Sequence, residues 1–266
     1  MSGRAVSFQL AHLEPHLRFQ TMSPVALVTG GAVRAGRAIT LALADAGYDM
    51  VVNYHTSEEP ARSLEVELTG QGREVLLAPG DVSDASAVER IGQEVRDRFG
   101  RLDVLVNSAA TFISTPLLEI ESEEWDRVMG VNLKGPHLLV REFAPLLRSS
   151  RGSIVNVADH MGLKPWVQYA HHSIAKAGLI HLTQIQAVAL APEVRVNAVA
   201  PGLVLAPESM SEAAVEREIE STLLQRPGTP EDVTRTVLFL VQSPFVTGQT
   251  IVVDGGGTLD QTPGFY

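Results

Sequence analysis

The chain has 266 residues, 45% of them hydrophobic and 20% charged, so it is long enough to bury a large core. Its formal net charge of −10 at pH 7 argues against nucleic acid or an anionic membrane as the main partner. The absence of cysteine excludes disulfides, thiol catalysis and cysteine-based metal sites. No apolar run is long enough to span a membrane. We therefore expect a cytoplasmic protein without nucleic-acid or membrane partners.

The two ends of the chain differ from its middle. Residues 1–23 contain scattered apolar and charged residues and lack the hydrophobic stretch of a signal peptide. We predict a flexible N-terminal extension over 1–23, a single domain over 24–258 and a short tail over 259–266. No set of histidines and carboxylates has the spacing of a metal site, so no metal is expected.

Strands and helices alternate along the whole domain. Short apolar runs predict buried strands over 25–28, 50–54, 74–78, 103–107, 153–157, 194–199 and 250–256. Amphipathic stretches predict helices over 36–46, after Ser57, over 85–99, within 121–148, over 169–190 and over 230–241. This alternation implies an α/β fold, a doubly wound, mainly parallel seven-stranded sheet with helices on both faces.

A glycine-rich turn separates the first predicted strand from the first helix. Gly30, Arg34, Ala35 and Gly36 lie in this turn, where backbone N–H groups and a helix N-terminus suit a pyrophosphate. Such a turn alone is a weak signal, and a purely structural turn is the alternative. Its place between a strand and a helix favours dinucleotide binding.

The end of the second strand indicates which dinucleotide binds. NAD-preferring sites carry an acid there that holds the ribose hydroxyls, but Asp49 lies at the opposite end of this strand. No carboxylate at the strand end would repel a 2′-phosphate, and His55, Ser57 and Arg34 are suited to receive one. The sequence therefore favours NADP(H). The cofactor-binding residues expected at this strand end are Tyr54, His55, Thr56 and Ser57.

Two later segments carry candidate acid–base groups. Asp159 follows the strand over 153–157, and the next helix carries His172 and Lys176. The last two residues stand four apart, so both lie on one face of that helix. Because the carboxyl ends of parallel strands meet at one edge of a sheet, we expect the three groups to converge there. A purely structural role for His172 is the alternative.

With these motifs in order, the chain resembles the short-chain dehydrogenase/reductase family over residues 24–258. The motifs that carry the resemblance, besides the glycine turn, Asp159 and Lys176, are Asp81-Val82, Asn107-Ser108-Ala109, Asn132 and Pro201-Gly202. By resemblance, the cofactor is contacted by Asp81, Val82, Asn107, Ser108, Ala109, Lys176, Pro201, Gly202 and Val204. The resemblance further implies that Lys176 holds the nicotinamide ribose, that Asn132 supports a proton path, and that the protein is a homotetramer.

Departures from the family pattern point to one of its branches. Arg34 replaces a glycine of the turn and Asp159 replaces the catalytic serine, as in the pteridine reductase and dihydromonapterin reductase branch. Phe112 matches the ring that stacks the pterin against the nicotinamide in that branch, with core packing as the alternative. The proton-donating tyrosine of the family is replaced by His172, and Tyr169, two helical turns before the lysine, is a poor substitute.

The resemblance implies a reductase, and the chemistry of Asp159 indicates which class of substrate it reduces. A carboxylate accepts hydrogen bonds from an amino-pyrimidine edge, which a plain ketone does not offer. We therefore expect NADPH-dependent reduction of a pterin or related C=N heterocycle, with catalytic residues Asp159, His172, Lys176 and Asn132. The expected substrate contacts, which include a lid over 203–225, are Arg34, Phe112, Asp159, His172, Leu203, Leu205 and Met210. One alternative is a reductase of 3-oxoacyl, quinone or other ketones, and another is an NADP-binding sensor without turnover.

Overall fold

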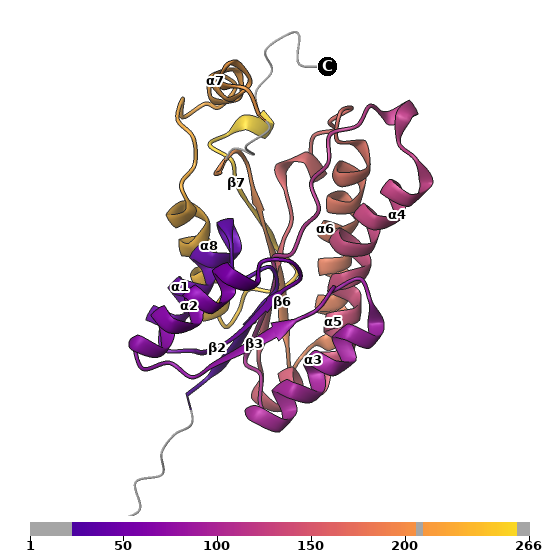
Figure 1. Cartoon of the computed structure of the whole chain (residues 1–266). Coiled ribbons are helices and arrows are strands. Elements are labelled where there is room, and N and C mark those ends of the chain that lie inside the picture. The colour runs from indigo at the N-terminus through magenta and orange to yellow at the C-terminus, as the bar shows by residue number, and fades with distance from the viewer. Residues whose placement is uncertain (1–22, 206–209, 260–266) are drawn as a thin grey trace, which may run out of the picture.

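The computed structural model describes residues 23–205 and 210–259, so most of the predicted N-terminal extension and C-terminal tail lies outside the described residues. Seven parallel strands form one sheet in the order β3-β2-β1-β4-β5-β6-β7 (Figure 1). This confirms the predicted doubly wound fold. The strands are β1 (Val25–Val28), β2 (Asp49–Tyr54), β3 (Val75–Pro79), β4 (Val104–Asn107), β5 (Ser153–Val157), β6 (Arg195–Pro201) and β7 (Thr250–Val253).

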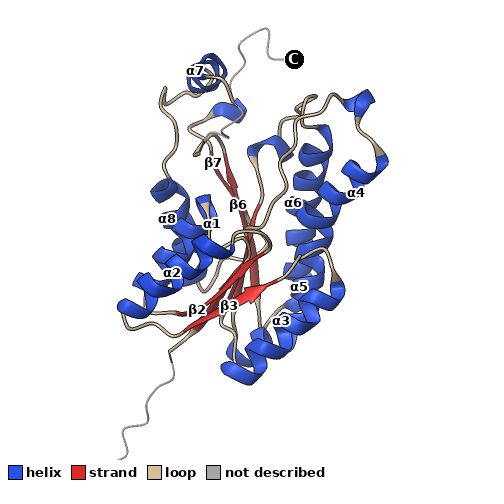
Figure 2. Ribbon diagram, viewed as in Figure 1, coloured by secondary structure: helices blue, strands red, loops and turns tan. Residues whose placement is uncertain are grey.

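Helices cover both faces of the sheet (Figure 2). On one face lie α1 (Arg34–Asp45), α2 (Glu58–Gly70) and α8 (Pro230–Gln242). On the other lie α3 (Ala85–Arg98), α4 (Ser122–Met129), α5 (Gly135–Ser150) and α6 (Ala170–Leu190). A separate helix, α7 (Glu212–Glu220), lies past the end of β7 within the predicted lid (Figure 1). Among the described helices, none combines the length and apolarity needed to cross a membrane.

The central strands are mainly apolar because helices exclude water from both of their faces. Every residue of β1 and β4 is buried. One cluster of buried side chains contains Phe143 and Leu147 of α5, and a second on the other face contains Ile39 and Leu43 of α1. These two cores hold the carboxyl ends of the strands in fixed positions.

The strand order reverses between β1 and β4, which are neighbours although β2 and β3 separate them in the chain. Open α/β sheets bind ligands in the crevice beyond the strand ends at such a point. The Thr29 hydroxyl oxygen joins the two strand ends by accepting the backbone N–H groups of Ser108, at 2.9 Å, and Ala109, at 3.0 Å. The crevice therefore begins between the first turn and the end of β4.

The helix predicted within 121–148 is in fact two helices joined by one π-helical turn, Gly130–Lys134. Asn132 lies in this turn with its side chain fully buried. Because a π turn inserts an extra residue into the helical repeat, it redirects the side chains that it carries. Here it turns the Asn132 amide toward the loop that follows β4.

Candidate active site

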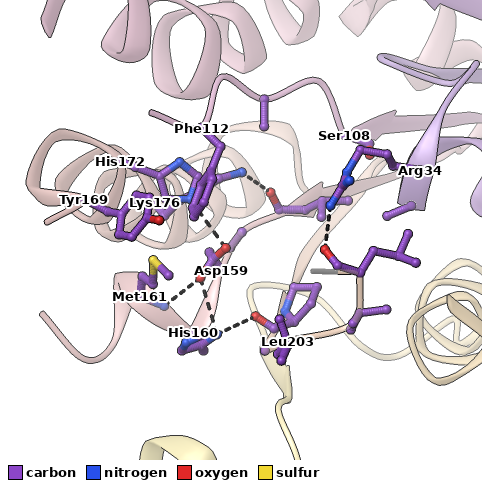
Figure 3. A pocket seen from close by; sticks show the side chains of 18 of the residues that line it. Arg34, Ser108, Phe112, Asp159, His160, Met161, Tyr169, His172, Lys176 and Leu203 are labelled. Carbon is purple, nitrogen blue, oxygen red and sulfur yellow. Dashed lines mark hydrogen bonds and ion pairs between the residues drawn. The ribbon is translucent and has the colours of Figure 1, made fainter. Parts of the chain in front are cut away.

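A pocket of about 750 Å³ lies beyond the carboxyl ends of β1, β4, β5 and β6 (Figure 3). Its wall is formed by the segments that follow these four strands and by the first turns of α6, with one side chain from α7. The structure therefore brings together residues that are far apart in the sequence. The predicted site residues that line the pocket are Gly30, Arg34, Ala35, Gly36, Ser108, Ala109, Phe112, Asp159, His172, Lys176, Pro201, Gly202, Leu203, Val204, Leu205 and Met210.

Other predicted residues do not line this pocket: Tyr54, His55, Thr56, Ser57, Asp81, Val82, Asn107 and Asn132. The first four lie at the end of β2, next to β1 in the sheet. The Asp81 carboxylate accepts the backbone N–H and the hydroxyl of Ser83, both at 2.8 Å. The Asn107 amide donates to the Asn156 side-chain oxygen at 2.7 Å. Asp81 and Asn107 thus have structural partners, and their contact with a cofactor stays a prediction.

The turn after β1 is tightly folded. Gly30 has a φ of +59°, and a Cβ on Gly36 would lie 2.1 Å from the Gly30 carbonyl oxygen, so neither position accepts a larger residue without strain. Arg34 also has a positive φ, 51°. Its guanidinium donates to the Leu205 carbonyl oxygen at 2.5 Å, so this side chain joins the turn to the segment after β6 (Figure 3).

The imidazole of His172 faces the pocket from the first turn of α6 (Figure 3). Its Nε2 lies 3.4 Å from a carboxylate oxygen of Asp159. Its Nδ1 lies 3.2 Å from the amide nitrogen of Asn132 and 3.3 Å from the carbonyl oxygen of Thr111. The contacts at Nδ1 therefore fix the orientation of the ring, and Nε2 faces the Asp159 carboxylate.

The Asn132 amide determines where the neutral imidazole carries its proton. Its oxygen accepts the Thr111 backbone N–H and its nitrogen donates to the Thr111 carbonyl, both at 2.8 Å, so the amide cannot be reversed. The second amide N–H then faces Nδ1 of His172, which accepts it only when it carries no proton. The neutral ring is therefore protonated at Nε2 and donates to Asp159.

Asp159 lies between two imidazoles. One oxygen faces His172, and the other accepts the Met161 backbone N–H at 2.8 Å and lies 3.5 Å from Nδ1 of His160. Burial alone would raise the pKa of this carboxyl group, but the hydrogen bond from His172, the charges of both histidines and the Met161 N–H together lower its pKa below the ordinary value. Asp159 is therefore ionised at neutral pH.

Lys176 lies one helical turn after His172 and is 3% exposed. Its ammonium donates to the Val157 carbonyl oxygen at 2.6 Å. Burial lowers the pKa of Lys176 from 10.5 to about 8, although the nearby charge of Asp159 raises it in part. Because about 8 is still above neutral pH, this side chain supplies a positive charge to the base of the pocket.

Aromatic rings form the opposite side of the site. Phe112 stacks on Tyr169 with ring centroids 4.4 Å apart and meets His172 edge-on at 4.8 Å. Phe112 is 38% exposed, so the alternative of a core residue is wrong. Tyr169 also lines the pocket, although its spacing from Lys176 had made it a poor substitute for the missing tyrosine. The two rings leave an apolar surface beside the imidazole.

Several residues of the pocket wall were not predicted from the sequence, and three of them have polar side-chain groups with no predicted role: His160, Trp166 and Glu218. His160 directly follows Asp159 at a strand end, and that position was a usable signal. Glu218 comes from α7, and nothing in the local sequence indicates that it reaches the pocket. In the described part of the chain, no group of three or more histidines and carboxylates is arranged to hold a metal ion.

Comparisons with known proteins agree with this geometry. Residues 32–258 match the family model described as enoyl-(acyl carrier protein) reductase. The chain is 36% identical over 241 residues to a 3-oxoacyl-(acyl-carrier-protein) reductase of Staphylococcus aureus, covering 88% of this chain and 98% of that protein. It is 38% identical over 237 residues to the protein of the same name from Synechocystis, covering 87% and 96%. A crystal structure described as a short-chain dehydrogenase/reductase from Burkholderia xenovorans superposes with a TM-score of 0.83 at 31% identity, covering 90% of this chain and 100% of that one.

Proposed function

Because the chain belongs to the short-chain dehydrogenase/reductase family, we propose that it is an NADP(H)-dependent reductase that transfers a hydride to a polarised C=O or C=N bond. The observation that carries this proposal is the convergence of Asp159, His172 and Lys176 on one pocket at the carboxyl edge of the sheet. The hydride is what the nicotinamide supplies when bound, so the chain has to position both reactants and provide a proton.

The residues present fit such a cofactor. In the turn over 30–36, a side chain on Gly30 or Gly36 would meet the protein's own backbone, so the turn stays tightly folded, and it leads into the N-terminus of α1. Arg34 supplies a cation, and no carboxylate stands among residues 54–57 at the end of β2. These features support NADP(H) over NAD(H). Lys176 would hold the ribose hydroxyls at the other end.

His172 is the proposed proton donor. Its neutral ring already carries a proton on Nε2, so the imidazolium forms when a proton from the solvent adds at Nδ1, where the Thr111 carbonyl oxygen at 3.3 Å accepts the new N–H. The ionised Asp159 lies 3.4 Å from Nε2 and carries the charge opposite to that of this imidazolium. The ring then releases the Nε2 proton to the substrate atom that gains the electron pair, while the Thr111 carbonyl oxygen holds the N–H at Nδ1.

A ketone of the 3-oxoacyl type is the first substrate class that we propose. Its support is the likeness, over nearly the whole chain, to two proteins named as 3-oxoacyl-(acyl-carrier-protein) reductases. An imidazolium at His172 is able to protonate the oxygen of such a ketone. The apolar surface of Phe112 and Tyr169 would lie beside the acyl chain.

A pterin-like C=N heterocycle is the second candidate, and the ionised state of Asp159 favours it. A carboxylate without a proton accepts hydrogen bonds from ring N–H and amino groups but repels the oxygen of a ketone. The partly exposed ring of Phe112 is also suited to stack on a planar substrate.

The test is NADPH oxidation by the full chain with a 3-oxoacyl thioester, a quinone and dihydrobiopterin, repeated with NADH. We expect turnover with at least one substrate, faster with NADPH, and loss of that turnover in His172→Gln. His181→Gln is the matched control, because His181 lies exposed on the same helix. Tight cofactor binding without turnover of any substrate would refute the proposal and favour an NADP-binding sensor.

A further inference from the structure

A histidine and a glutamate that the proposed proton transfer does not use lie side by side on the pocket wall. His160 follows β5, and Glu218 reaches the same wall from α7. Their side chains are 8% and 11% exposed, and Nε2 of His160 lies 3.6 Å from a Glu218 carboxylate oxygen. Buried polar groups ordinarily have hydrogen-bond partners, but this Nε2 has none among the described residues.

The atoms around His160 indicate which nitrogen of its neutral ring carries the proton. Nδ1 lies 3.1 Å from the Pro201 carbonyl oxygen and 3.5 Å from an Asp159 carboxylate oxygen. Because both neighbours are acceptors, Nδ1 carries the proton of the neutral ring, and Nε2 presents a lone pair. The separation of 3.6 Å between Nε2 and Glu218 is too long for a direct hydrogen bond. Two acceptors thus face the same space, and in the described part of the chain no group donates a hydrogen bond to this Nε2.

We propose that His160 and Glu218 form a subsite that binds an amino or amidine-type group of the substrate through its N–H donors. Such a group has two or more N–H bonds, so it can bridge Nε2 and the Glu218 carboxylate. Carboxylate or phosphate groups are excluded because two acidic side chains would repel them. This inference rests on the proposed function, since the group belongs to the molecule that is reduced.

The electrostatics of Glu218 agree with a role in binding. Burial raises the pKa of this carboxyl group, although the charge of Lys164 lowers it in part. A hydrogen bond from a ligand N–H group is stronger when the accepting carboxyl group is shielded from water than when it is exposed. The exposed Glu220 of the same helix lacks this environment and is therefore a matched control.

The test is a binding measurement that needs no turnover. 2,4-diaminopteridine and lumazine share one ring system, but the first carries amino groups where the second carries oxo groups. Their affinities for the full chain saturated with NADP⁺ are measured by titration calorimetry. We expect the diamino compound to bind more tightly, and Glu218→Gln to weaken it by about tenfold while leaving lumazine unchanged. Glu220→Gln should change neither affinity.

A second variant covers the case in which Glu218→Gln disturbs α7. His160→Asn keeps a donor for the Pro201 carbonyl oxygen but removes Nε2, and it should also reduce the preference for the diamino compound. Equal weakening of both compounds would overturn the inference, because the pair would then only hold α7 in place. Absence of a preference in the wild type, or of binding by either compound, would overturn it as well. A preference without turnover in the oxidation assay would instead refute the proposed function alone.

Discussion

The buried ammonium of Lys176 makes the stability of the protein depend on pH in a defined window. Burial lowers the pKa of this side chain from 10.5 to about 8. One pKa unit corresponds to about 1.4 kcal/mol, so a shift of about 2.5 units means that the folded protein disfavours the ammonium by about 3 kcal/mol. Replacing Lys176 with methionine removes the titrating group and keeps an unbranched side chain of similar length.

The direction of the effect follows from proton binding. Below about pH 8 the amine is charged in both the folded and the unfolded chain, so its contribution to the free energy of unfolding is constant. Between about 8 and 10.5 the unfolded chain binds more protons, so the free energy of unfolding of the wild type rises with pH. Lys176→Met lacks this rise, and the difference between the two proteins should grow by about 3 kcal/mol across the window.

The assay is urea unfolding of both proteins at a fixed concentration, at several pH values from about 7 to about 10. Lys134→Met is the control, because Lys134 is exposed and its variant should follow the wild type. Curves of wild type and Lys176→Met that stay parallel above about pH 8 would refute the reasoning. They would mean that the amine is not desolvated as the structure has it.

Three further predictions concern activity. His172→Gln should lower kcat by at least about a hundredfold while the Kd for NADPH, from calorimetry, stays unchanged; retained kcat would remove this residue from proton transfer. Arg34→Ala should reduce the preference for NADPH over NADH in kcat/KM by about tenfold, since a charge-assisted hydrogen bond to phosphate is lost, and an equal loss with both cofactors would contradict this. Phe112→Ala should raise KM severalfold for a planar heterocycle and less for an aliphatic 3-oxoacyl thioester, and identical changes in both would argue against stacking.

Much of the fold could be predicted from the sequence because buried parallel strands are mainly apolar on both faces. The convergence of Asp159, His172 and Lys176 also followed from one rule, that the carboxyl ends of parallel strands share an edge. The break between α4 and α5 was not predictable in the same way. The apolar periodicity continues through the π turn at Asn132, and only its contacts with Thr111 reveal the altered direction.

The contribution of α7 to the pocket wall could not be predicted from the sequence, for a different reason. The contact between Glu218 and His160 depends on how a polar helix packs over a strand end that lies far away in the chain. Local propensity carries no information on such a contact. Tyr169 shows the same limit, because its distance from Lys176 along the helix says nothing about its stacking on Phe112.

The central claim is that this pocket transfers a hydride while His172 supplies the proton. It is tested most directly by following NADPH labelled with deuterium at the reactive nicotinamide carbon into the product of a 3-oxoacyl thioester or a dihydropterin. We expect deuterium on the reduced carbon of the product with the wild type, and almost no labelled product with His172→Gln. Label transfer at an equal rate in both proteins, or no transfer to either substrate by the wild type, would contradict it.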